Sequence, residues 1–118
     1  MQLPSDAVLL RIFIGENDKF ERLPLYEAIV LKARAMHLAG ATVLRGPMGF
    51  GHSSRLHTTK ILRLSDDLPL VIEIVDVQPK IDAFLPEVDA MMSSGLIKLE
   101  RVQVLQYGAP DKPNAGFR

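Results

Sequence analysis

Short segments in which apolar residues alternate with polar ones, or run together as β-branched blocks, predict the strands of this chain. The segment 70–75, Leu-Val-Ile-Glu-Ile-Val, is the most β-like of them and is predicted to be a central strand. In the last segment the apolar phase shifts between Leu99 and Val102, which predicts a β-bulge near Glu100-Arg101. The predicted strands are 8–14, 42–45, 70–75 and 97–107, with 58–64 as a further, outer strand.

Two other segments repeat apolar residues at steps of three and four positions, which predicts amphipathic helices. The first helix is expected over 25–39. Pro24 is well placed at its start, because the missing N–H of proline is not needed there. Gly40 fits the stop, because glycine readily adopts the backbone conformation that ends a helix.

The second helix is predicted between Pro79, in its first turn, and Gly95, just past its end. Pro86 lies inside this segment, where a proline removes a backbone hydrogen bond at a cost of about 3 kcal/mol. We therefore expect either a bend on the solvent side or an irregular first half. The helix face predicted to be buried consists of Ile81, Phe84, Leu85, Val88, Met91 and Met92.

The order of these elements, β-α-β-β-α-β, is that of the ferredoxin-like split βαβ fold, an α+β architecture with two helices on one face of an antiparallel sheet. A chain of 118 residues suits one such domain, which we place at 1–107, with 108–118 as a mobile tail rich in Pro and Gly. Strands 8–14 and 70–75 carry apolar residues on both faces. We therefore expect the second face to be covered, and self-association is the economical explanation.

Charge and composition narrow the class of protein. Lys plus Arg equal Asp plus Glu at 14 each, so the formal net charge is zero. No apolar run approaches the roughly 20 residues that span a bilayer, and no secretory signal is visible. The absence of cysteine excludes disulfides, thiolate nucleophiles and cysteine-type zinc sites. We expect a soluble, cytoplasmic protein that is not embedded in a membrane.

The most informative local feature is a cluster of positive charge around a glycine-spaced loop. Between Ala28 and Leu64 the chain has six Lys or Arg residues, all three histidines and no acid, and Gly46-Pro-Met-Gly49-Phe-Gly51 lies inside that stretch. Glycines permit positive φ and a close backbone approach, so amide N–H groups could converge on a phosphate. The alternative is a hairpin turn that needs these glycines for its own geometry. The segment 47–57 is predicted to be an exposed, mobile loop.

Arginines near this loop are candidate anion ligands, because a guanidinium binds an oxyanion through two parallel hydrogen bonds. Arg45, at the strand end just before the glycines, is the first choice, and Arg55 in the loop is the second. Because the positive charge is local and the whole chain is neutral, a small anion is favoured over nucleic acid. An RNA-binding sheet would also show two or three stacking aromatic residues, and the central strands offer only Phe13. Further candidates are Lys60, Arg63 and, if a bulge turns it inward, Arg101.

The spacing of the histidines and the absence of a nucleophile motif argue against a metal site and against catalysis. His52 and His57 are five positions apart, without the spacing of a helical zinc pair, and only His37 remains as a third nitrogen ligand. No Gly-x-Ser-x-Gly elbow is present, so we assign no catalytic residue and no metal ligand. The alternative is a small enzyme on the same scaffold that uses His52 or His57 as an acid or base. Three acids lie near the first helix: Glu16, Asp18 and Glu27. Their interpretation stays open between ribose contacts, a general acid/base pair, and solvated charges that are favourable near a helix N-terminus.

A set of short motifs spread over residues 10–107 resembles one known family. The motifs are Ile14-Gly-Glu-Asn-Asp-Lys19, Pro24-Leu-Tyr-Glu27, Gly40-Ala-Thr-Val-Leu-Arg-Gly46, Gly49-Phe-Gly51, Ser54-Arg55 and Leu68-Pro-Leu-Val-Ile-Glu-Ile-Val-Asp76. Together they resemble PII-like signalling proteins, and specifically the branch called domain of unknown function 190. Gly49-Phe-Gly51 is similar to the glycine pair at the base of the PII T-loop. The Gly-Asp-Gly-Lys phosphate loop of true PII proteins is missing.

The resemblance implies a non-catalytic homotrimer that binds an adenine nucleotide in clefts between its subunits, near the base of a T-loop-like segment at 47–57. It implies AMP, ADP, ATP or cyclic AMP as the ligand, with no obligatory cofactor, and a regulated partner such as a membrane transport protein. The segment Ser93-Ser-Gly-Leu-Ile-Lys98 occupies the place of the missing phosphate loop, and Lys98 is a candidate for the lost lysine. The nucleotide-binding residues expected are Arg45, Gly46, Gly49, Phe50, Gly51, Arg55 and Lys98.

Overall fold

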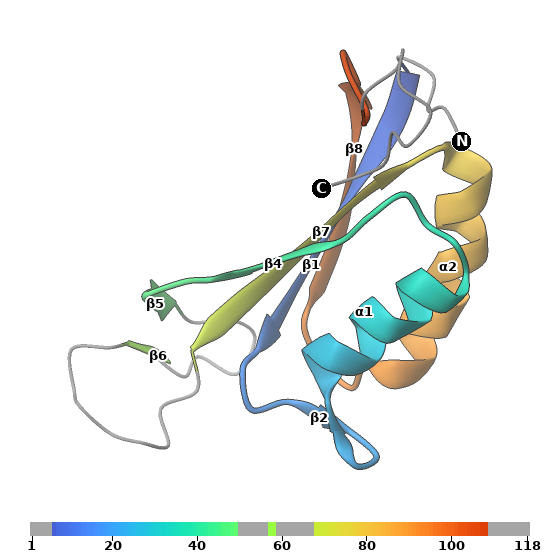
Figure 1. Cartoon of the computed structure of the whole chain (residues 1–118). Helices are drawn as coiled ribbons and strands as arrows, with labels where there is room; N and C mark the ends of the chain where they lie inside the picture. Colours follow the sequence, from blue (N-terminus) through green and yellow to red (C-terminus); the bar gives the residue numbers. More distant parts are fainter. Residues whose placement is uncertain (1–5, 50–56, 59–67, 109–118) are drawn as a thin grey trace.

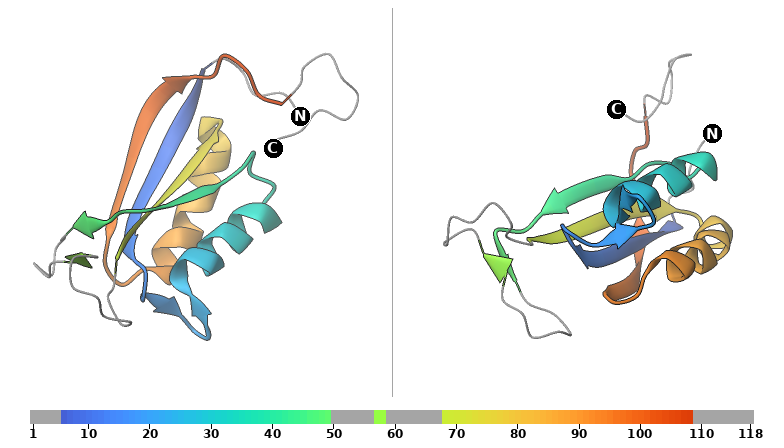
Figure 2. Two further views of the ribbon diagram at one scale, coloured as in Figure 1. Left: turned by 60° about the vertical axis from the view of Figure 1, so that its left-hand side comes forward. Right: turned by 90° about the horizontal axis from the view of Figure 1, so that it is seen from below.

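The computed structural model describes residues 6–49, 57–58 and 68–108. Its main elements are β1 (Asp6–Gly15), α1 (Leu25–Ala35), β4 (Thr42–Arg45), β7 (Pro69–Asp76), α2 (Gln78–Met91) and β8 (Leu96–Gln103). The four strands form an antiparallel sheet in the order β4-β7-β1-β8 (Figure 1). Both helices lie on one face of this sheet (Figure 2). The predicted ferredoxin-like α+β architecture is therefore confirmed.

Two short ladders accompany the main sheet. β2 (Lys19–Phe20) pairs with β3 (Leu23–Pro24) just before α1, and β5 (Met48–Gly49) pairs with β6 (His57–Thr58) beyond the end of β4. The segment predicted as a mobile loop over 47–57 thus begins and ends in an antiparallel ladder. Residues 50–56 of that loop, most of the predicted outer strand 58–64 and the predicted tail after Gly108 lie outside the described residues.

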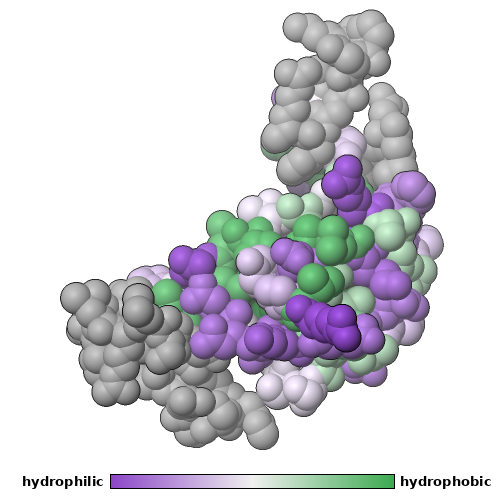
Figure 3. Space-filling view, turned by 60° about the horizontal axis from the view of Figure 1, so that its bottom comes forward, coloured by the Kyte–Doolittle hydropathy of each residue, from purple (hydrophilic) through white to green (hydrophobic). Residues whose placement is uncertain are grey.

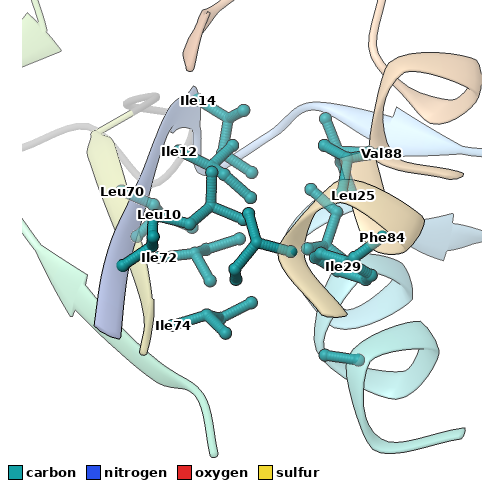
Figure 4. Close-up of a cluster of buried hydrophobic side chains, with 13 residues drawn as sticks. Leu10, Ile12, Ile14, Leu25, Ile29, Leu70, Ile72, Ile74, Phe84 and Val88 are labelled. Atoms are coloured by element: carbon teal, nitrogen blue, oxygen red, sulfur yellow. The ribbon is translucent and has the colours of Figure 1, made fainter. Parts of the chain in front are cut away.

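The hydrophobic core fills the space between the sheet and the two helices (Figure 4). β1 and β7 occupy the middle of the sheet, as predicted for 70–75, and every second residue of each strand points toward the helices. Each fully buried apolar side chain of this size contributes about 1.5–3 kcal/mol to folding. The completely buried apolar side chains are Leu10, Ile12, Ile29, Ile72, Ile74, Ile81, Phe84 and Val88.

Asp76, the last residue of β7, is a completely buried carboxylate, and no other charged residue in the described part of the chain is buried. Its Oδ1 accepts a hydrogen bond from the Val77 N–H at 2.7 Å, at the start of α2. Its Oδ2 accepts one from the Ala39 N–H at 2.8 Å, in the connection between α1 and β4. One side chain therefore joins β7, the N-terminus of α2 and the segment that leads into β4.

α1 ends earlier than the sequence predicts, at Ala35 instead of Ala39. His37 has the left-handed φ of 60°, its N–H bonds to the Arg34 carbonyl, and the Leu38 N–H bonds to the Ala33 carbonyl. This pair of bonds is the Schellman motif, which usually has glycine at the left-handed position. The prediction was wrong because it assigned the helix stop to Gly40, whereas His37 already has the left-handed φ that ends the helix.

Near the end of the domain, the predicted irregular first half of the second helix and the predicted β-bulge were also wrong, whereas the alternative, a bend at Pro86, stays a prediction. α2 is continuous from Gln78 to Met91, and Pro86 lies on its exposed side, where the missing N–H does not leave a buried group without a partner. β8 pairs with β1 in one unbroken register, so no bulge is present, and it ends at Gln103. Its apolar residues change face because β8 is an edge strand, whose helix-side positions beyond Ile97 are exposed.

Candidate functional site

The base of the loop is formed where three strands meet at one end of the sheet. Gly15 at the end of β1 lies opposite Pro69 at the start of β7, and Arg45 at the end of β4 lies opposite Leu70. The Gly46 N–H donates to the Pro69 carbonyl at 2.7 Å. The chain therefore leaves the sheet at Gly46 and re-enters it at Pro69, and a backbone hydrogen bond joins these two residues. The start of β7 is also paired with β1 on one side and with β4 on the other.

Gly46 and Gly49 are required by close packing on Pro69. A Cβ added at Gly46 would lie 2.9 Å from Pro69 Cγ, and one added at Gly49 would lie 3.2 Å from the same atom. Neither glycine has a positive φ; among the described glycines only Gly95 and Gly108 do. These two glycines therefore do not use the positive φ that glycine permits, and the Gly46 N–H already has a carbonyl partner. These glycines thus shape the base of the loop, as the hairpin alternative also requires.

Arg45 is the exposed cation at this base, and it forms an ion pair with Glu16. The Arg45 side chain is 62% exposed, whereas that of Glu16 is 23% exposed. Glu16 follows β1 directly, and its N–H donates to the Leu68 carbonyl at 2.7 Å. Two residues later, Asp18 accepts a hydrogen bond from the Gly15 N–H at 2.9 Å. The fold therefore places two carboxylates beside a region that contains no acid in the sequence.

Of the predicted site residues, the structure brings together Arg45, Gly46 and Gly49. Lys98 lies on β8, at the opposite edge of the sheet. There it pairs with Glu100 at 3.7 Å, and its Nζ stands 5.6 Å from the centre of the Phe13 ring. Within one chain Lys98 and Arg45 do not share a site. The other predicted nucleotide-binding residues, Phe50, Gly51 and Arg55, lie outside the described residues.

The sheet face opposite the helices is a second candidate surface. Its strands align Leu44, Val71, Phe13 and Leu96 in one row across the sheet. The next row is Thr42, Glu73, Arg11 and Lys98. Leu44 and Leu96 at the two edges are 49% and 55% exposed. An apolar row of this kind on an uncovered sheet favours contact with another protein surface.

Arg11 organises the polar row on this face. Its Nε donates to Glu73 at 2.8 Å and its Nη1 donates to Glu100 at 2.7 Å. The hydrogen bond to Glu73 is the main cause that raises the pKa of the Arg11 guanidinium. Burial opposes this rise, and the charges of Glu100 and Glu73 add to it. Arg11 is therefore charged at any working pH, and its charge is balanced within the chain.

Two hollows on the described surface lie away from the loop base. One, of about 570 Å³, lies between the β2–β3 hairpin and the helices. Figure 3 shows the molecule turned so that its lower side comes forward, where hydrophobic residues gather with hydrophilic ones around and among them. The other, of about 280 Å³, lies on the open sheet face beside Tyr107, whose hydroxyl donates to the Ala39 carbonyl at 2.8 Å.

In the described ranges no cluster of three or more His, Asp or Glu side chains could hold a metal ion. None of the described helices is long and apolar enough to cross a membrane.

Two solved structures of one PII-like protein share this fold. CPII, a nitrogen regulatory PII-like protein from Thiomonas intermedia K12, has been solved bound to ADP, AMP and bicarbonate. It aligns with a TM-score of 0.55 at 20% identity and covers 86% of this chain and 90% of its own. A second structure of CPII, bound to ADP and bicarbonate, aligns with a TM-score of 0.54. This chain therefore shares the fold of the PII-like protein CPII.

The particular family follows from sequence. The family DUF190, described as uncharacterized ACR, COG1993, matches residues 7–104. A UPF0166 protein of Aquifex aeolicus is 40% identical over 97 residues, which cover 82% of this chain and 91% of that protein. A UPF0166 protein of Methanocaldococcus jannaschii is 36% identical over 92 residues, or 77% of this chain and 84% of that protein. The chain belongs to the DUF190 family, and the predicted resemblance is confirmed.

Proposed function

We propose that this protein is a PII-like signalling protein: a non-catalytic, cytoplasmic homotrimer that binds an adenine nucleotide between its subunits. The nucleotide changes the loop that follows Gly46, and a partner protein, such as a membrane transport protein, responds to that change. The proposed site includes Arg45, Gly46 and Gly49 at the base of the loop, with Phe50, Gly51 and Arg55 in it. Lys98 would come from a neighbouring subunit.

The observation that carries this proposal is the position of Arg45. Its guanidinium is largely exposed at the end of β4, where the chain leaves the sheet for a segment that holds three further Lys or Arg residues and no acid up to Leu64. An exposed guanidinium is suited to a phosphate group. The PII-like protein CPII, which shares this fold, was solved with ADP bound. A nucleotide phosphate at Arg45 therefore accounts for the charge pattern of the loop.

Two features support assembly between chains. The open sheet face carries the apolar row from Leu44 to Leu96, which a neighbouring subunit would cover. In addition, Arg45 and Lys98 lie at opposite edges of the sheet, so one ligand can reach both only if they come from two chains. A cleft between subunits satisfies both observations.

The proposal is tested by calorimetry and thermal unfolding with adenine and guanine nucleotides, cyclic AMP and inorganic phosphate as the anion control. We expect one class of adenine nucleotide to bind saturably, with a stabilisation of about 2.7 kcal/mol at a ligand concentration 100 times Kd. Arg45→Ala should weaken binding about tenfold or more, because it removes a charge-assisted hydrogen bond. Arg22→Ala, which removes an exposed arginine of the β2–β3 turn, is the matched control and should bind as the wild type does.

Three results would count against parts of this proposal. The absence of binding by any nucleotide would remove the sensor function. A monomer in light-scattering measurements of mass would remove the cleft between subunits. Conversion of the nucleotide during a long incubation, lost on His57→Ala, would favour the enzyme alternative over a non-catalytic sensor.

A further inference from the structure

The ion pair between Arg45 and Glu16 bears directly on which ligand the loop base accepts. Arg45 ends β4, whereas Glu16 follows the end of β1, and only the fold brings the two together. Arg45 is largely exposed, while Glu16 is the more enclosed partner. The Glu16 backbone is also fixed, because its N–H bonds to the Leu68 carbonyl at 2.7 Å. The carboxylate is therefore the less movable half of the pair.

A phosphate that binds Arg45 must lie close to the Glu16 carboxylate. Glu16 contacts Nη2 of the guanidinium, which has five N–H donors in all, so other donors of the same group are available to a ligand. A phosphate bound there would be separated from the Glu16 carboxylate only by the planar guanidinium. Like charges so close repel one another, and the repulsion grows with the negative charge of the ligand.

Within the same chain, Lys98 does not compensate for the charge of the Glu16 carboxylate. Lys98 is at the far edge and is already paired with Glu100. Asp18 adds a further acid near the end of β1, where it accepts the Gly15 N–H. At the described loop base, Arg45 is therefore accompanied by two carboxylates: Glu16, which pairs with it, and Asp18, which caps the end of β1.

We propose that Glu16 is a specificity-determining residue that makes the Arg45 site select nucleotides of low negative charge. Adenosine monophosphates bind with little penalty, and each additional phosphate costs affinity through repulsion by the Glu16 carboxylate. This inference rests on the proposed function, since it concerns the same site. It differs from a purely structural role for the pair, in which Glu16 would only hold Arg45 against the end of β1.

The test compares wild type with Glu16→Gln, a substitution that keeps the shape of the side chain and removes its charge. Affinities for adenosine, AMP, ADP and ATP are measured by calorimetry without divalent cations. We expect Glu16→Gln to leave adenosine unchanged and to tighten binding by about twofold for AMP, rising to about fivefold for ATP. Glu87→Gln is the matched control, because Glu87 also forms a surface ion pair, with Lys32 at 3.5 Å, far from the loop. It should change none of the four affinities.

The outcomes separate the inference from the proposed function. If nucleotides bind the wild type and Glu16→Gln changes all four affinities equally, or none, charge selection by Glu16 is overturned and the nucleotide site stands. If Glu16→Gln binds every nucleotide more weakly and unfolds at a lower temperature without ligand, the pair is structural and the inference is overturned. If no nucleotide binds either protein, the proposed function and the inference both fail.

Discussion

Replacing Asp76 with alanine should destabilise the protein strongly, because this carboxylate is completely buried and accepts two backbone hydrogen bonds. Asp76→Ala removes the carboxylate that accepts the N–H groups of Ala39 and Val77. A buried donor left unsatisfied costs about 1–3 kcal/mol, so the two together predict a loss of about 2–6 kcal/mol in the free energy of unfolding. Asp76→Asn keeps one carbonyl acceptor but turns an NH₂ group toward the other N–H, so about half of that loss is expected.

The measurement is urea unfolding followed by circular dichroism, at one protein concentration for all variants, because the stability of an assembly depends on concentration. Asp89→Ala, which removes an exposed aspartate of α2, is the control and should stay within about 0.5 kcal/mol of wild type. A loss below about 1 kcal/mol for Asp76→Ala would refute the reasoning, since the two N–H groups would then have found other partners.

Two further predictions concern backbone geometry. Gly46→Ala should lower stability by about 1–3 kcal/mol and Gly49→Ala by less, because the added Cβ would lie 2.9 Å and 3.2 Å from Pro69 Cγ; equal melting temperatures for the two variants would contradict this packing. His37→Gly should raise stability by up to about 1 kcal/mol, because glycine adopts the left-handed φ of 60° without strain. Thermal unfolding checks both, and a His37→Ala variant as stable as His37→Gly would show that the backbone angle is not the cause.

The sequence predicted the elements that have a buried side better than their ends. β4 was predicted at its observed bounds, and the predicted strands 8–14 and 70–75 are β1 and β7, because alternate residues of a half-buried strand must be apolar. The end of α1 was misplaced because any residue can take a left-handed φ when tertiary contacts favour it. Here the Lys80 ammonium donates to the His37 carbonyl at 2.5 Å, from a helix that local sequence cannot place.

The candidate site was only partly predictable for a similar reason. Arg45 and the glycines were found from their spacing and from the local absence of acids. Glu16 was named among three acids with several open roles, and nothing in its position along the chain indicates that it pairs with Arg45. Lys98 was grouped with Arg45 by resemblance, and the sheet order separates the two within one chain.

The sequence by itself determined the fold class, the family and the position of the glycine-spaced loop. Each of these depends on local periodicity, or on residue types that stand close together along the chain. Only the tertiary structure decided the electrostatics of the loop base: a stretch without a single acid in the sequence is met in space by Glu16 from the end of β1. The physical reason is that charges interact through distance in space, and a sheet brings together the ends of strands that are far apart in the chain.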